Sequence, residues 1–122
     1  MSHIHLPHNH GEHDEELLNI ASNTEAFQAV ADIFRQLSDG NRVRIFWILC
    51  HCEECVINLS AMMEMSSPAL SHHLKLLKSA GLIVSRREGK EVYYKAADPP
   101  QVHLLHEMLE SQFEFSCPLT GK

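Results

Sequence analysis

The chain has 122 residues, 44% of them hydrophobic, and a formal net charge of −6. This length predicts one folded domain with a modest core. No apolar run reaches the length of about 18 residues that marks a membrane span, and the polar residues 1–14 lack the apolar stretch of a secretory signal. We therefore expect a cytoplasmic protein whose cysteines stay reduced.

The two ends of the chain predict tails on either side of that domain. Residues 1–14 hold five of the ten histidines and show no apolar periodicity, which predicts a disordered tail. We place the folded domain at residues 15–116 and a C-terminal tail at residues 117–122.

Three helices are predicted in the first half of the domain. A short helix begins near Glu15. Apolar side chains at helical spacing predict a second helix, which Asn23 or Thr24 can cap and which a breaker at residues 38–41 ends. A third helix covers about residues 41–50, and a polar connector follows it.

The middle of the chain predicts a helix, a turn and a longer helix. Residues 56–63 form the first of these helices, and residues 64–66 form the turn. Ser67 is an N-cap candidate, Pro68 stands at the first helical position, and Gly81 ends the longer helix. The apolar spacing in this helix predicts a buried stripe of Leu70, Leu74 and Leu77.

An alternating pattern follows the longer helix. Residues 82–87 and 91–95 are typical of strands, and the turn between them contains Gly89, which supplies the positive φ of a tight hairpin. Residues 98–115 predict a last helix. The predicted fold class is therefore mainly α with a two-stranded β wing, which is a winged helix-turn-helix.

Charge is distributed unevenly along the chain. Residues 67–96 contain six basic and two acidic side chains, a net charge of +4, whereas residues 1–66 carry −7 and residues 97–122 carry −3. A local positive region of this kind matches the phosphate backbone of DNA. The acidic net charge of the whole chain therefore does not exclude double-stranded DNA as a partner.

The longer helix and the hairpin carry the predicted DNA contacts. Hydroxyl and imidazole groups near a helix N-terminus suit base edges, and basic side chains suit phosphates or the minor groove. The alternative is a polar helix face that is only solvated and a hairpin that only caps the core. The predicted DNA-binding residues are Ser67, Ser71, His72, His73, Lys75, Lys78, Arg86, Arg87 and Lys90.

The chain resembles the ArsR/SmtB family of bacterial repressors in three segments, LSDGNRVRIFWILC, ECVINLSAMMEMSSPALSHHLKLLKSAGLI and SRREGKEVYYKAAD. The most specific parts are residues 71–75 and 87–90. The resemblance, which covers about residues 27–115, implies a homodimer formed through the first and last long helices. It also implies binding to an imperfect inverted-repeat operator, with Ser67, Ser71 and His72 where the family contacts bases, and release by an inducer.

The cysteines are our first choice for an inducer site. Thiolates suit Zn²⁺ or another thiophilic metal or metalloid ion. Cys55 matches the first cysteine of the family's Cys-Val-Cys motif, but Ile57 stands at the second position, so the relatives' site is not carried over whole. The alternative is that these side chains are small buried hydrophobic groups. The predicted ligands are Cys50, Cys52, Cys55 and Cys117.

The last helix offers a second choice. His103, His106, Glu107 and Glu110 share one face by their spacing. Relatives with a zinc site begin this helix with Asp-x-His; Asp98 matches, but Pro100 replaces the histidine, so that specific site is broken. The alternative is an ordinary solvated face.

We therefore predict a DNA-binding transcriptional repressor that an ion releases from its operator. One alternative is a response to oxidants or reactive sulfur through Cys50 or Cys52 paired with Cys117, and another is a metal-buffering protein. No Gly-rich phosphate loop, nucleophile elbow or His-Glu-x-x-His helix is present, so we expect neither an enzyme nor a small organic substrate. We also expect no membrane partner.

Overall fold

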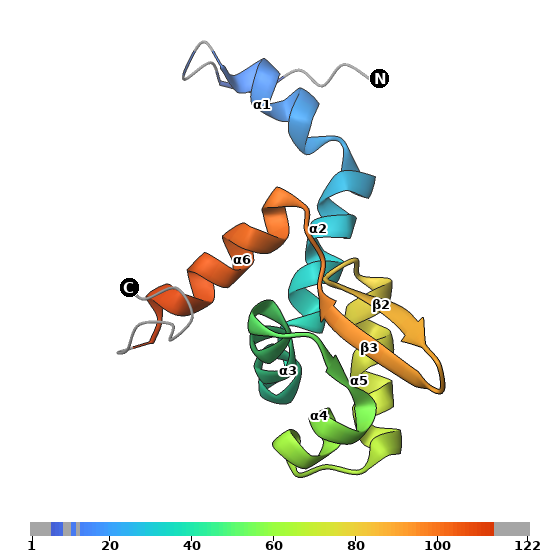
Figure 1. Ribbon diagram of the computed structural model, residues 1–122. Helices are drawn as coiled ribbons and strands as arrows, with labels where there is room; N and C mark the ends of the chain where they lie inside the picture. The colour runs from blue at the N-terminus through green and yellow to red at the C-terminus, as the bar shows by residue number, and fades with distance from the viewer. Residues whose placement is uncertain (1–5, 9–10, 12, 114–122) are drawn as a thin grey trace. The chain divides into compact units, whose positions relative to one another are not determined.

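The computed structural model describes residues 6–8, 11 and 13–113 (Figure 1). Its elements, in chain order, are α1 (Asp14–Ala21), α2 (Thr24–Gln36), α3 (Gly40–His51), β1 (Glu54–Cys55), α4 (Val56–Met63), α5 (Ser67–Ser79), β2 (Ile83–Glu88), β3 (Glu91–Ala96) and α6 (Pro100–Ser111). Contacts divide the chain into two units, residues 1–32 and residues 33–122. None of these helices has the length and apolar character that a membrane crossing requires. The predicted tails lie for the most part outside the described residues.

The first unit contains α1 and most of α2. The Asn23 side-chain oxygen accepts the Ala26 N–H at 3.2 Å, which confirms Asn23 as the N-cap of α2. Neither helix has a fully buried side chain. The large apolar side chains that this unit exposes are Leu17, Ile20, Phe27 and Val30.

The core of the second unit is built on α3, which packs against α4, α5, α6 and β3. Asp39 caps α3 by accepting the Arg42 N–H at 3.1 Å, so the helix begins inside the predicted breaker and extends to His51. The predicted stripe of α5 is confirmed. The buried core consists of Ile45, Phe46, Leu49, Leu59, Met63, Leu70, Leu74, Leu77, Leu82, Ile83, Ala97 and Val102.

The N-cap of α5 is Ser66, and the prediction of Ser67 was wrong by one residue. The Ser66 hydroxyl accepts the Ala69 N–H at 3.3 Å, whereas Ser67 is the first helical residue and Pro68 the second. Two adjacent serines offer the same hydroxyl group, so composition alone does not distinguish them. Gly81, with a φ of 77°, follows the helix as predicted.

The wing is a hairpin of β2 and β3, as predicted, with Glu88 opposite Glu91 and Gly89 at a φ of 63°. A third strand, β1, pairs antiparallel with β3, so the order in the sheet is β1-β3-β2. The sequence did not predict β1 because it is two residues long and its pairing joins segments far apart in the chain. Its pairing anchors the base of the wing next to the start of α4.

The last helix, α6, begins at Pro100. Val102 is buried against the core, whereas Leu104 and Met108 are 64% and 46% exposed. The helix ends at Ser111 with Gln112 as its C-cap, so the prediction that it reaches about residue 115 is wrong, because apolar spacing does not fix the residue at which a helix ends. The exposed Leu104 and Met108 give α6 an apolar surface.

Ser66→Ala should lower the free energy of unfolding by about 1 kcal/mol, because it removes the acceptor of an orphan N–H at the start of α5. The matched variant Ser67→Ala should lower it much less. Urea unfolding followed by circular dichroism measures both. Equal losses in the two variants would contradict the assignment of the cap.

Candidate nucleic-acid interface and metal-binding cluster

The N-terminal half of α5 exposes polar side chains because its leucines point into the core. Ser71, His72 and Lys75 are exposed on this helix. His73 is half-buried, and its Nδ1 lies 3.4 Å from an Arg42 guanidinium nitrogen on α3. His73 is thus tied to the neighbouring helix, whereas the other three side chains face solvent.

Two further predicted contact residues bond to neighbouring elements. The Ser67 hydroxyl lies 3.3 Å from that of Ser60 on α4. Lys78 donates to the Ser85 hydroxyl on β2 at 2.7 Å, so it links the longer helix to the wing. Ser67 and Lys78 are nevertheless both exposed, at the edge of the helix-turn-helix.

Arg86 on the wing is neutralised by acidic neighbours. Its guanidinium donates to both carboxylate oxygens of Glu53 at 2.8 Å and also pairs with Glu88. It lies 4.8 Å from the centre of the Tyr93 ring. The hydrogen bonds from Arg86 hold the pKa of Glu53 below its ordinary value, and the same bonds raise the pKa of Arg86. Arg87 and Lys90, by contrast, are exposed on the hairpin.

The predicted thiol ligands occupy different environments. Cys55 is buried in β1, whereas Cys50 and Cys52 are half-buried. The Cys52 thiol donates to the Ile48 carbonyl at 3.4 Å, and burial together with the charge of Glu54 raises its pKa. Cys52 therefore favours the neutral thiol over the thiolate that binds metals. Cys117 lies outside the described residues.

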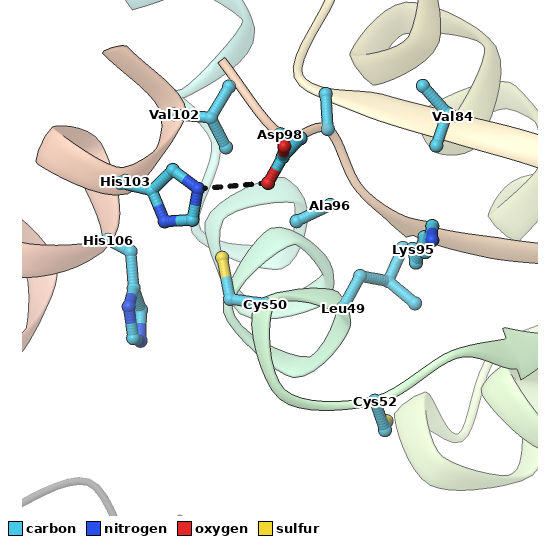
Figure 2. A pocket seen from close by; sticks show the side chains of 11 residues that line it. Leu49, Cys50, Cys52, Val84, Lys95, Ala96, Asp98, Val102, His103 and His106 are labelled. Carbon is cyan, nitrogen blue, oxygen red and sulfur yellow. Dashed lines mark hydrogen bonds and ion pairs between the residues drawn. The ribbon is translucent and has the colours of Figure 1, made fainter. Parts of the chain in front are cut away.

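Cys50 lines a pocket of about 670 Å³ between the end of α3, the base of the wing and α6 (Figure 2). His103 and His106 line the same pocket. His103 is exposed and its Nε2 lies 3.3 Å from a carboxylate oxygen of Asp98. Cys52 lines the pocket as well, so the pocket brings two predicted thiol ligands beside two residues of the predicted α6 site.

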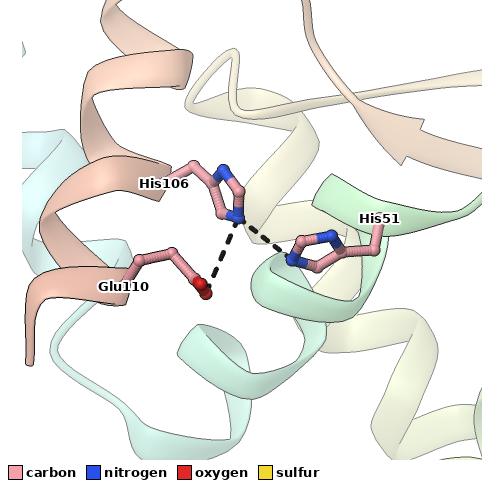
Figure 3. Close-up of side chains that lie close together, drawn as sticks. All are labelled: His51, His106 and Glu110. Carbon is pink, nitrogen blue, oxygen red and sulfur yellow. Dashed lines mark hydrogen bonds and ion pairs between the residues drawn. The ribbon is translucent and has the colours of Figure 1, made fainter. Parts of the chain in front are cut away.

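The end of α3 and the middle of α6 bring together His51, His106 and Glu110 (Figure 3). The His106 Nε2 lies 3.0 Å from the His51 Nε2 and 3.8 Å from a carboxylate oxygen of Glu110. Burial lowers the pKa of His51, and the nearby His106 lowers it further, whereas Glu110 opposes this shift. Within the described part of the chain, this is the one group of three or more potential ligands that lie close together.

The second-choice ligands therefore separate into two pairs. His106 and Glu110 meet His51, whereas His103 and Glu107 are exposed. His51 was not among the predicted metal ligands, because the predicted helix ends at about residue 50 and leaves His51 in the polar connector. Extending α3 by one residue would have placed His51 one turn after Trp47, on the side that faces α6.

The pattern for bacterial regulatory proteins of the arsR family matches residues 39–85, from the cap of α3 into β2. The chain is also 40% identical over 86 residues to a cadmium resistance transcriptional regulatory protein, a CadC homolog, of Staphylococcus aureus, a match that covers 70% of this chain and 71% of that protein. The chain belongs to the ArsR family. This assignment confirms the resemblance seen in the sequence, and the family consists of transcriptional regulators rather than enzymes.

Other ArsR-family proteins agree with this assignment. The chain is 39% identical over 83 residues to a transcriptional repressor SmtB homolog of Synechocystis. This match covers 68% of this chain but only 63% of that protein. Less than two thirds of that relative is therefore matched. The homodimeric winged helix-turn-helix DNA-binding domain of a possible ArsR-family regulator from Mycobacterium bovis superimposes with a TM-score of 0.63 at 27% identity, covering 84% of this chain and 85% of that one. The predicted winged helix-turn-helix fold is confirmed.

Acid should weaken the ion pair of this ArsR-family wing. Because Arg86 depresses the pKa of Glu53, the pair contributes fully above the ordinary glutamate pKa of about 4.3 and is lost as the pH falls through the lower folded-state value. Glu53→Gln should therefore lower the free energy of unfolding at neutral pH and leave it unchanged well below about pH 4.

Urea unfolding at a series of pH values measures this effect, with Glu107→Gln, an exposed glutamate on α6, as the control. The expected difference at neutral pH is small, because the pair is exposed to solvent. An unchanged pH profile in Glu53→Gln would show that the pair does not form in solution.

Proposed function

We propose that this ArsR-family chain is a homodimeric repressor that binds an inverted-repeat operator in double-stranded DNA and is released by a metal or metalloid ion. The observation that carries the proposal is the exposed polar face at the start of α5, next to a basic hairpin. A helix N-terminus with hydroxyl and imidazole groups, flanked by cations, is suited to the major groove and its phosphates.

The exposed residues of α5 divide into two roles in this proposal. Ser71 and His72 lie on the solvent face in the first half of the helix and contact base edges. Lys75 contacts phosphate, as Ser67 and Lys78 do from the edges of the helix-turn-helix. His73 supports the helix through Arg42 rather than reaching a base.

The wing contacts DNA mainly through Arg87 and Lys90. Both are exposed, whereas Arg86 already has a bidentate partner in Glu53. A contact between Arg86 and phosphate requires this pair to break, and because the pair is exposed to solvent this offsets only part of the gain. Arg86 therefore stays in the predicted interface with a weaker role.

The proposal of a homodimer rests on large apolar side chains that are exposed in the described part of the chain. Phe27 in the first unit is 53% exposed, and Leu104 and Met108 on α6 are also exposed. Exposed apolar side chains on the first and last long helices are typical of surfaces that associate. The M. bovis relative is described as a homodimer, which supports the same arrangement here.

The proposal of an ion as inducer draws on the CadC homolog, which is named for cadmium resistance. The thiols of Cys50, Cys52 and Cys55 are the soft donors of this chain, with Cys117 beyond the described residues. A thiol site would draw its ligands from these cysteines, because a bound metal ion deprotonates a coordinating thiol even where its pKa is raised, as it is for Cys52. The alternative response to oxidants pairs Cys50 or Cys52 with Cys117.

Ser71→Ala combined with His72→Ala should abolish specific binding to operator DNA, because each good base contact contributes about 1–3 kcal/mol of discrimination and a dimer loses both copies. Fluorescence anisotropy with DNA from the promoter of this protein's own gene, at fixed salt, measures the affinity. The control is Ser79→Ala, at the far end of the same helix, which should bind as the wild type does. Unchanged affinity in the double variant would overturn the proposed recognition helix.

Arg87→Ala and Lys90→Ala should each weaken DNA binding more than Arg86→Ala does, because only Arg86 is paired in the free protein. Each lost phosphate contact should also reduce the slope of log affinity against log salt by about 1. Salt titrations of the three variants measure this. An equal or larger effect of Arg86→Ala would show that Arg86 leaves Glu53 when DNA binds.

A further inference from the structure

The cluster of His51, His106 and Glu110 joins two helices at a place that the proposed DNA contacts do not use. His51 is the last residue of α3, and His106 and Glu110 lie four residues apart on α6. All three side chains are half-buried, and their ligand atoms lie within 4.8 Å of one another (Figure 3). Such convergence of two imidazoles and a carboxylate from two helices suits a metal ion as well as a hydrogen-bonded network.

The spacing of the ligand atoms fits a bound ion. Ligand atoms that surround Zn²⁺ tetrahedrally at about 2.0–2.2 Å are about 3.4 Å from one another. The distances from the His106 Nε2 to His51 and to Glu110, 3.0 Å and 3.8 Å, lie on either side of that value. These two spacings are therefore close to those of ligand atoms around a bound ion.

Trp47 holds the carboxylate of the cluster in place. Its indole N–H donates to Glu110 at 2.5 Å, and its ring packs edge-on against that of His51, with centroids 4.7 Å apart. Metal-binding carboxylates and histidines are commonly oriented by such outer partners, which increase metal affinity about 10–100-fold. Trp47 is thus suited to be a positioning residue for two of the three ligands.

We propose that His51, His106 and Glu110 bind a divalent first-row transition ion within one chain, with a fourth position open to water. Two nitrogens and one oxygen suit borderline ions such as Zn²⁺, Ni²⁺ and Co²⁺, whereas soft metalloid ions require thiolates. The site differs from the predicted stripe on α6, because it replaces His103 and Glu107 with a residue of α3.

The bound ion would fasten α6 to α3. Since α3 packs directly against α5, the ion would bias the position of the proposed dimer helix relative to the proposed recognition helix. This regulatory consequence rests on the proposed function, whereas metal binding itself does not. An ion changes DNA affinity only if it binds the two arrangements of these helices unequally.

The first experiment measures binding of Zn²⁺ and Co²⁺ to the reduced full-length protein. His106→Gln combined with Glu110→Gln should lose this site, with an affinity at least about 100-fold lower. The matched control, His103→Gln combined with Glu107→Gln, changes the same residue types at the same spacing on the same helix and should bind as the wild type does. Binding by other histidines is common to all three proteins and does not affect the comparison.

Co²⁺ also reports the donor atoms. The site should give a ligand-field spectrum without strong thiolate-to-cobalt charge transfer, and Cys52→Ser combined with Cys55→Ser should leave it unchanged. Trp47→Phe keeps all three ligands and should lower affinity about 10–100-fold. Zn²⁺ should raise the unfolding midpoint of the wild type and of the control by more than that of the ligand variant.

The outcomes separate this inference from the proposed function. Equal metal affinity in the ligand variant and the wild type, or a cobalt spectrum that is the same in both, would overturn the metal site even if DNA binding is normal. Loss of DNA binding in Ser71→Ala combined with His72→Ala should leave metal affinity unchanged. If the site binds Zn²⁺ but the ion changes DNA affinity equally in the wild type and the ligand variant, the regulatory consequence is wrong.

Discussion

Burial of one face of α3 holds the second unit together. Ile45, Phe46 and Leu49 are almost fully excluded from water, and each large side chain of this kind contributes about 1.5–3 kcal/mol when it is buried. The helix contacts α4, α5, α6 and β3, so the helix-turn-helix, the wing and the last helix are positioned by the same core. Because such cores are closely packed, a shift of α3 cannot be absorbed locally.

The central position of α3 links the proposed DNA-binding surface of α5 to the cluster of His51, His106 and Glu110. On one side, α3 supports the proposed recognition helix α5 through the leucine stripe and the contact between Arg42 and His73. On the other side, its last turn presents Trp47 and His51 to α6. A ligand that fixes the contact between α3 and α6 can therefore act on the contact between α3 and α5 through rigid, packed elements, without a flexible connector.

The ion pairs of Arg86 reduce the number of unpaired cations in the proposed DNA interface, which a count of charges along the sequence does not show. Residues 67–96 carry a net positive charge, but Glu53, which lies outside that segment, neutralises Arg86. The wing therefore presents Arg87 and Lys90 as exposed cations near the hairpin turn, and Lys95 is exposed on β3. The acidic net charge of the chain is compatible with this local field, since charges in solution are screened beyond about 8–10 Å.

The sequence by itself determined the order and type of the helices of the winged fold, the hairpin, the buried leucines of α5 and the family, because these depend on periodicity, turn residues and local motifs. The tertiary structure decided which of two adjacent serines caps α5, the pairing of β1 with β3, the neutralisation of Arg86 and the meeting of His51 with α6. Each of these four features is a contact between specific atoms. In most cases, the atoms come from segments far apart in the chain. Residue spacing predicts which side chains share a face of one helix, but only packing decides which face of another element they meet.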